Sequence, residues 1–309
     1  MAPCSRLEWV EMSRLKRILE AGQFAVTAEI TPPASSDLAE LLAKAAPLKG
    51  LADAVNVTDG AGARPHLEST VAASVLLEND IEPILQLTCR DRNRIALQSQ
   101  LLGAAALGIE NLLVLKGDDP TKGDQPEAKA VFDLDSAGLT ATAVAMRDHG
   151  RLPHGRAVGG GAHFFVGVAD APIDPPPGWI PVGLIKKVES GAQFAQTQFC
   201  MDADIVRRYA ARLADSGLAG KLHLLVGVAP LASAKSARWI KSHLAGSIIP
   251  DQFVDRLDRA SDPAAEGRAI CIDLVKQLRE IAGVGGAHIM SPLNPAAIVE
   301  VIEALRAAL

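Results

Sequence analysis

The chain has few aromatic residues and lacks the signatures of disulfide-rich and membrane-spanning proteins. Of its 309 residues 4% are aromatic, and the four cysteines (Cys4, Cys89, Cys200 and Cys271) never form a CxxC pair. Metal-ligand spacing is therefore missing, and scattered cysteines favour free thiols in a reducing compartment. No run of about 18 apolar residues could span a membrane. Since the amino terminus lacks the apolar core of a signal peptide, we expect a cytoplasmic protein.

The charge of the chain excludes nucleic acid as a partner. The formal net charge is −5, which provides no basic footprint for DNA or RNA. The hydrophobic fraction of 49% and the charged fraction of 22% are typical of a globular protein. A chain of this length buries most of the surface that it would expose when unfolded. We predict a single domain over residues 1–309, with residues 1–22 as an N-terminal helical extension.

Short apolar runs alternate with helical patterns from residue 24 onwards. Segments such as residues 204–217 carry apolar residues at helical spacing and end in glycine, as helices often do. Eight βα repeats close a barrel, so we predict an α/β protein with the (β/α)8 TIM-barrel fold. A doubly wound sheet would need a GxGxxG turn after its first strand, and residues 28–36 contain none. The predicted strands are residues 24–30, 52–58, 82–88, 111–117, 163–169, 194–200, 222–228 and 287–291.

Polar side chains collect where the predicted strands end, which is where barrel enzymes carry their chemistry. A single polar residue at a strand end is usually just solvated, but the whole set predicts a polar cup. Its members are Glu29, Thr58, Asp59, Gln86, Thr88, Lys116, Asp118, Asp170, Gln196, Gln198, His288 and Ser291. Of these, His288 lies in an apolar strand, where a histidine is more often a satisfied core residue than a catalyst.

Two carboxylates of the cup are candidates for catalysis. Glu29 lies within the stretch VTAEITPP, and burial among apolar residues tends to raise the pKa of a carboxyl so that it can act as a general acid. The alternative is a structural ion pair with a neighbouring lysine. Asp118 follows a buried strand in the stretch LLVLKGDDP, and Lys116 on the same strand face is its obvious partner.

Three arginines, Arg90, Arg92 and Arg94, follow the third predicted strand and open a helix that Asp91 could cap. Cations at a helix amino terminus oppose the macrodipole, which a bound phosphate or carboxylate would explain. The alternative is that they pair with Asp59, Asp91 or acids of the loops. Taken alone, these residues predict a barrel enzyme with an acidic residue or two and an anion-binding mouth, and they do not define a reaction.

An ordered set of motifs resembles the methylenetetrahydrofolate reductases, most closely the shorter bacterial type that consists of the catalytic barrel only. The motifs extend over nearly the whole chain and are AEITPP, NVTDGAGARPH, LQLTCRDRNR, LKGDDP, PVGLIKKVESGAQFAQTQF and GVAPLASAKSA. The resemblance implies a flavin-dependent oxidoreductase with FAD at the carboxyl ends of the strands. Such an enzyme takes hydride from NADH or NADPH and passes it to 5,10-methylenetetrahydrofolate in a ping-pong reaction, giving 5-methyltetrahydrofolate.

The resemblance also implies roles for individual residues. Glu29 corresponds to the acid that helps to open the folate ring, and Gln198 corresponds to a glutamine that binds the substrate. Asp118 corresponds to the catalytic aspartate beside the flavin pyrimidine edge and the pterin. The positions expected to bind the cofactor are Thr58, Gln86, Gly117, Lys187, Asp118 and, for an anionic group of the flavin or folate, Arg90.

The chain departs from the family pattern at positions that grip the dinucleotide. Gln86 stands where better-known members carry histidine before LTC, and Val182 and Gly183 stand where longer polar side chains are usual. FAD, FMN, a weakly held flavin and no flavin therefore all stay open. Besides the reductase, the alternatives are a folate-binding subunit of a larger redox complex and a flavin-free reductase with direct transfer from the nicotinamide. The choice between NADH and NADPH, the pathway, and assembly as a homo-oligomer or with a partner redox subunit are not readable.

Overall fold

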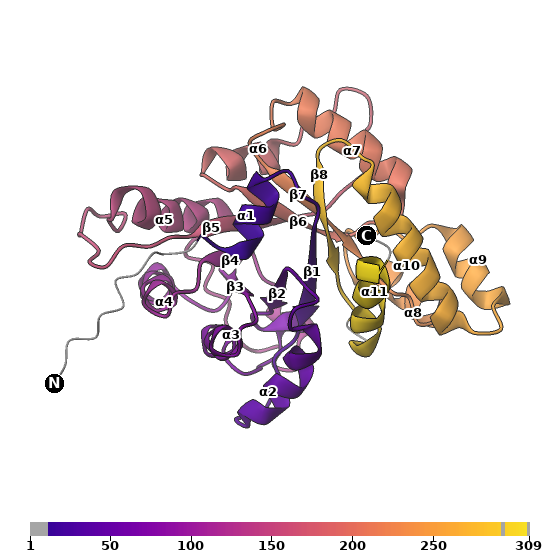
Figure 1. The fold of residues 1–309 in the computed structure, drawn as a ribbon. Coiled ribbons are helices and arrows are strands. Elements are labelled where there is room, and N and C mark those ends of the chain that lie inside the picture. The colour runs from indigo at the N-terminus through magenta and orange to yellow at the C-terminus, as the bar shows by residue number, and fades with distance from the viewer. Residues whose placement is uncertain (1–11, 292–293, 308–309) are drawn as a thin grey trace.

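Eight parallel strands close into a barrel in the computed structural model, which describes residues 12–291 and 294–307 (Figure 1). Each strand pairs with the next one along the chain, and β8 pairs with β1 in a register that sets Thr27 beside His288. The strands are β1 (Ala25–Ile30), β2 (Ala54–Val57), β3 (Pro83–Thr88), β4 (Asn111–Leu115), β5 (Phe165–Asp170), β6 (Phe194–Phe199), β7 (His223–Val228) and β8 (Val284–Ile289). The predicted TIM barrel is confirmed.

Helices form an outer ring around the strands (Figure 1). No helix within the described part of the chain has the length and apolar character needed to cross a membrane. The ring closes where Arg306 of the last helix donates from Nε to the backbone oxygen of Leu51, at 3.0 Å. Its helices are α2 (Leu38–Ala45), α3 (Ser69–Glu78), α4 (Arg94–Ala106), α5 (Ser136–His149), α6 (Val182–Glu189), α7 (Ala203–Asp215), α8 (Ala234–His243), α9 (Asp251–Arg259), α10 (Pro263–Arg279) and α11 (Ala296–Ala307).

Side-chain caps decide where helices of the ring begin. The amide oxygen of Asn93 accepts from the backbone N–H groups of Ile95 and Ala96 and so caps α4. The expectation that Asp91 caps this helix is wrong, because its carboxylate is bonded to the Arg90 guanidinium instead. An Asn two residues later satisfies the same free N–H groups, so the cap and the ion pair do not compete.

The last strand is the one that the sequence placed least well. It was expected at residues 287–291 and is found at Val284–Ile289, because Gly285 and Gly286 hide its start. A Cβ on Gly286 would lie 2.5 Å from the backbone oxygen of Ala25. Glycine within a strand often marks such a close approach of two backbones. The seam between β8 and β1 therefore needs the residue that weakened the sequence signal.

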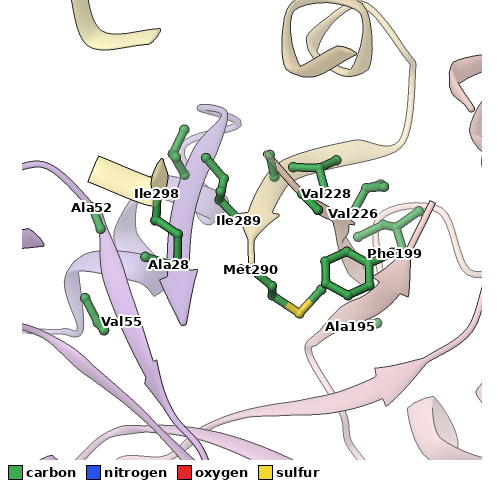
Figure 2. Packing of buried hydrophobic residues seen from close by; sticks show 14 of the residues in the cluster. Ala28, Ala52, Val55, Ala195, Phe199, Val226, Val228, Ile289, Met290 and Ile298 are labelled. Atoms are coloured by element: carbon green, nitrogen blue, oxygen red, sulfur yellow. The ribbon is translucent and has the colours of Figure 1, made fainter. Parts of the chain in front are cut away.

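The main hydrophobic core lies between the outer face of the barrel and the ring of helices. Figure 2 shows part of it, with Ala28 of β1, Val226 of β7 and Ile289 of β8 among the labelled side chains. All three are fully buried. This face of the strands alternates with the residues that point into the barrel, since successive side chains of a strand point to opposite sides.

A second, smaller core closes the amino-terminal end of the barrel. Leu15 and Leu19 of α1 (Arg14–Glu20) pack against Phe165 and Phe194, whose rings stack with centroids 4.9 Å apart. The start of α1 is fixed by Glu82, whose Oε1 accepts from the backbone N–H of Leu15 at 2.9 Å. A helix therefore forms the floor of the barrel, which leaves the carboxyl ends of the strands as the accessible end.

Candidate active site

Above the apolar floor, the interior of the barrel is filled by buried polar side chains that bond to one another. Asn56 and Gln196 exchange two amide hydrogen bonds, of 2.6 and 3.1 Å. Gln196 also donates to Thr27 Oγ1 at 3.2 Å, and this hydroxyl lies 3.0 Å from His288 Nδ1. All four residues are buried. Because buried polar groups are costly unless they are bonded, this layer holds its members in defined orientations.

Glu29 lies next to this layer, towards the barrel mouth. Its Oε2 accepts from Gln86 Nε2 at 2.9 Å and lies 3.6 Å from His288 Nε2. The Glu29 side chain is 24% exposed, whereas that of His288 is 3% exposed. The structural alternative, an ion pair with a lysine, is not what the described residues form. The carboxylate accepts a hydrogen bond from an amide, has an imidazole 3.6 Å away, and still reaches the mouth.

Asp118 lies beyond the end of β4, in a turn that Gly117 makes with a φ of +92°. Its Oδ2 accepts from the backbone N–H of Gly62 at 3.0 Å, and the residue is exposed. Lys116 is not its partner, since the ammonium group lies 5.7 Å from the centroid of the Phe132 ring. This is a cation–π arrangement. The structural alternative for Asp118, an ion pair with Lys116, is thus not formed, and the carboxylate is held by backbone instead.

Gly117 has a reason within the protein to be glycine. A Cβ at this position would lie 2.8 Å from Cβ of Arg90 and 3.2 Å from Cβ of Thr88. The positive φ independently disfavours other residues. Its small size is therefore explained by packing against β3, without a bound cofactor.

The three arginines of the mouth are each paired with a carboxylate. Arg92 makes two bonds of 2.7 and 3.0 Å to the buried Asp59, and Arg94 bonds Asp133 at 2.8 Å. The hydrogen bond from Arg94 holds the pKa of Asp133 well below its usual range, at about 2. The alternative interpretation of the arginines accounts for these contacts, so a bound anion is not required to explain them.

Arg90 is buried as well as paired. It is 4% exposed and bonds both the Asp91 carboxylate, at 2.8 Å, and the backbone oxygen of Gly60. The hydrogen bond to Asp91 raises the pKa of the Arg90 guanidinium, which stays charged. Its donors are directed at the protein, and this reduces what it can offer to a cofactor.

A cavity of about 290 Å³ lies beside the mouth, between the connections that follow β2, β3 and β4. Its lining includes the polar side chains of Asp59, Arg64, His66, Arg90, Arg92 and Gln125. Arg64 is exposed, and the sequence analysis did not single it out. The cavity places cationic side chains where a negatively charged part of a ligand could lie.

Other expected site residues lie at the same end of the barrel and form no hydrogen bond with Glu29. Gln198 follows a bulge in β6, and its Oε1 accepts from the backbone N–H of Phe199 at 3.0 Å. Lys187 donates to the backbone oxygen of Ala169 at 2.6 Å. Thr58 is buried, and its hydroxyl oxygen has no hydrogen-bond partner among the described residues. The amide donor of Gln198 and the hydroxyl of Thr58 thus form no hydrogen bond within the described residues.

Asp170, also in the expected cup, has a structural partner. The Tyr209 hydroxyl donates to its Oδ2, and Trp179 packs on the Tyr209 ring with centroids 5.6 Å apart. Burial and the nearby Asp170 raise the pKa of Tyr209, so the phenol stays protonated as a donor. This contact ties β5 to α7 and uses the carboxylate for packing.

The polar layer beneath Glu29 is the part that sequence reasoning missed. His288 was expected to be a satisfied core residue, and it is buried and bonded as expected, but it also contacts the candidate acid. The available signal was the alternation along β1, where Ala25, Thr27 and Glu29 point into the barrel. Polar residues two apart on several strands predict a bonded interior layer only after the strand register is known.

Comparisons with known proteins cover most of the chain. The model of the family described as methylenetetrahydrofolate reductase matches residues 14–306. A 5,10-methylenetetrahydrofolate reductase from Pectobacterium carotovorum subsp. carotovorum is 26% identical over 265 residues, which cover 83% of this chain and 82% of the relative. A probable methylenetetrahydrofolate reductase (NADPH) from Caenorhabditis elegans is 23% identical over 77% of this chain. The chain spans 34% of the length of that nematode relative.

A solved structure has the same fold. It is that of an uncharacterized protein from Clostridium thermocellum that binds two copies of 5-methyl-5,6,7,8-tetrahydrofolic acid. The TM-score is 0.67 at 12% sequence identity, and the likeness covers 96% of this chain and 100% of that one. At this level of identity the likeness establishes the barrel and not the chemistry.

Proposed function

The chain belongs to the methylenetetrahydrofolate reductase family, a family of oxidoreductases, and from this premise we propose that it reduces 5,10-methylenetetrahydrofolate to 5-methyltetrahydrofolate with NAD(P)H. The observation that carries the proposal is Glu29, a carboxyl at the barrel mouth whose Oε2 accepts from Gln86 and lies 3.6 Å from His288 Nε2. The folate bound by the structural neighbour supports a folate substrate for this barrel. We propose that Gln198 contributes a substrate contact through its amide donor.

The reaction needs one proton and one hydride. The bond between the methylene carbon and N10 breaks as N10 takes the proton, which leaves the methylene carbon as an iminium on N5. Hydride from NAD(P)H then adds to this carbon, so that NAD(P)+ and 5-methyltetrahydrofolate are the products. Glu29 is the group that supplies the proton, because it is partly exposed and its neighbours leave one oxygen free.

The residues at the mouth fit the ring of a flavin at two points. The buried Thr58 hydroxyl has no partner among the described residues and would bond to the ring. Asp118 has one carboxylate oxygen beyond the one that Gly62 occupies, and it would lie at the ring edge. Gly117, Gln86 and Lys187 are the other positions proposed for this group, whether FAD or FMN. A bound flavin would take hydride from NAD(P)H and pass it to the folate.

Direct hydride transfer from the nicotinamide to the folate is a second candidate, which the ion pairs of the mouth favour. Arg90, Arg92 and Arg94 each bond a carboxylate, so a flavin pyrophosphate would have to compete for them. Val182 and Gly183 open α6 without a polar side chain, and its preceding residue Pro181 provides no side-chain cap. Both features reduce the number of side chains available to bind a dinucleotide, and neither involves Glu29.

An anaerobic absorption spectrum of the purified protein tests these proposals. A flavin band that NADH or NADPH bleaches, and that methylenetetrahydrofolate restores, is the expected result. A colourless protein that still oxidises NAD(P)H in the presence of methylenetetrahydrofolate would establish direct transfer. A protein that binds the folate but catalyses neither reaction would contradict the proposed activity. It would then favour a folate-binding subunit that receives electrons from a partner.

A further inference from the structure

His288 approaches the candidate acid from inside the barrel. Its Nε2 lies 3.6 Å from Oε2 of Glu29, the same oxygen that accepts from Gln86 Nε2. None of the hydrogen bonds within residues 12–291 and 294–307 uses Oε1 of Glu29. The two oxygens of this carboxyl are therefore different, since one faces two groups of the protein and the other is left for a proton and a substrate.

The partners of the other ring nitrogen determine which tautomer His288 adopts. The Thr27 hydroxyl lies 3.0 Å from Nδ1 and 3.4 Å from the backbone oxygen of Ala287. It accepts from Gln196 Nε2 at 3.2 Å, and its own proton can be donated to Nδ1 or to the backbone oxygen of Ala287. Gln196 Nε2 also approaches Nδ1, at 3.4 Å. With the Thr27 hydroxyl donating to Nδ1, that nitrogen carries a lone pair and the proton of the neutral ring lies on Nε2.

The orientation of Gln196 is tied to that of Asn56. The two amides exchange two bonds, so turning one group alone would set oxygen against oxygen. The tautomer of His288 is thus coupled to a layer that begins on β2 and β6 and ends on β8. Among the described residues, the side chains within hydrogen-bonding distance of the His288 ring are Thr27 and Gln196, and both are neutral.

We propose that His288 is a positioning residue, whose Nε2–H holds Oε2 of Glu29 so that Oε1 carries the proton delivered to the substrate. This inference rests on the proposed function. In the step that it serves, the Oε1–H bond breaks and the proton passes to N10 as the bond from N10 to the methylene carbon breaks. The carboxylate that remains is stabilised on Oε2 by His288 and Gln86. Glu29 regains its proton from solvent, because its side chain is 24% exposed and that of His288 only 3%.

The geometry can be measured on the unsubstituted protein, with a variant needed only to assign the signals. In the intact protein labelled with 15N-histidine, NMR distinguishes a protonated from an unprotonated ring nitrogen, and His288→Gln identifies the signals by their loss. The expected result at neutral pH is a protonated Nε2 and an unprotonated Nδ1. A neutral ring with its proton on Nδ1 would overturn the proposal, because Nε2 would then have no proton to donate to Glu29.

Kinetics across pH test the role. His288→Leu removes the donor, and a hydrogen bond to a charged group is worth about 10- to 100-fold. We expect kcat for folate reduction to fall by about this factor, with KM little changed. The pH at which the rate declines should rise, because the Glu29 carboxylate loses a group that stabilises its charged form. His288→Gln keeps an N–H near the same place and should restore most of the rate.

Several controls separate the outcomes. If the leucine and glutamine variants lose the same activity with unchanged pH profiles, His288 is only structural and the proposal fails. Thr27→Val preserves shape and removes the hydroxyl that sets the tautomer, so it provides the same test if the leucine variant does not fold. A lack of methylenetetrahydrofolate reduction by the unsubstituted protein would refute the proposed function. In that case the NMR measurement would still confirm or refute the geometry.

Discussion

The two ends of the barrel are built on opposite principles. At the floor, Leu15 and Leu19 of α1 close the interior against Phe165 and Phe194, and contact among apolar atoms holds this end together. At the mouth, Glu29 and its neighbours are held by directed hydrogen bonds and remain partly open. The strands are continuous between the two ends, so the difference comes from which side chains point inward at each level.

The comparison shows how one scaffold separates stability from chemistry. Burial of apolar area is non-directional and tolerates small shifts, whereas an acid must keep its oxygen and its proton in one place. A polar layer lies between the two regions, and its hydrogen bonds fix the side chains beneath Glu29. Its members are Thr27, Asn56, Gln196 and His288. Substitutions at the two ends should therefore separate activity from stability.

The largest effect is expected at the mouth, from Glu29→Gln. The substitution keeps the volume of the side chain and removes the proton donor, so folate reduction should fall by about 10³-fold, which is within the range of general acid catalysis. Thermal unfolding and the oxidation of NAD(P)H by an artificial acceptor should change little. Loss of both half-reactions would mean that Glu29 maintains the site instead of acting on the folate.

A substitution at the floor should lower stability and leave activity nearly unchanged. Leu19→Ala removes a side chain that is 2% exposed and leaves a cavity beneath the barrel, so the free energy of unfolding should fall by about 3 kcal/mol. The kcat of the folded protein should stay within about twofold, because no polar contact of the mouth is touched. Leu102→Ala on the outer surface, where 37% of the residue is exposed, is the matched control and should cost much less. Denaturant unfolding measures both, and equal losses would contradict the assignment of the floor as a core.

Asp118→Asn should have a smaller effect on the mouth. An asparagine oxygen can still accept from Gly62, so the turn is retained while the negative charge is lost. We expect folate turnover to slow by about tenfold, or about 1.4 kcal/mol, and the potential of any bound flavin to rise, because the negative charge disfavours the anionic reduced form. Steady-state rates and a redox titration measure the two effects. If neither changes, the proposed role of Asp118 beside the cofactor and the pterin is wrong.

The smallest effect is expected from Thr58→Val, which preserves shape at a buried position. The hydroxyl has no partner within the described residues, so its removal should not lower the stability of the protein. If it bonds a flavin, the Kd of the flavin should rise by about three- to tenfold, the value of one hydrogen bond. Fluorescence titration with FAD and FMN measures this change. An unchanged Kd together with normal folate turnover would favour direct transfer from the nicotinamide.

Much of the architecture could be predicted from the sequence because the strands of a parallel barrel are short, apolar and regularly spaced. Seven of the eight strands lie within two residues of their expected bounds at each end, and β8 was displaced where Gly285 and Gly286 replace side chains that would mark it. The cap of α4 was assigned to Asp91 instead of Asn93, because several nearby residues can accept from the same N–H groups. Asp91 bonds the Arg90 guanidinium, and Asn93 is left to accept from the N–H groups that open α4.

The sequence by itself determined the alternation of strands and helices, and with it the end of the barrel at which Glu29, Asp118 and Gln198 lie. This follows because the side-chain period of a strand and the direction of a parallel sheet are local properties. Only the tertiary structure decided the partners of these residues. Lys116 lies over Phe132 instead of pairing with Asp118, and His288 reaches Glu29 across the seam where the barrel closes. Contacts between residues so far apart in the chain depend on register and closure, which no stretch of sequence contains.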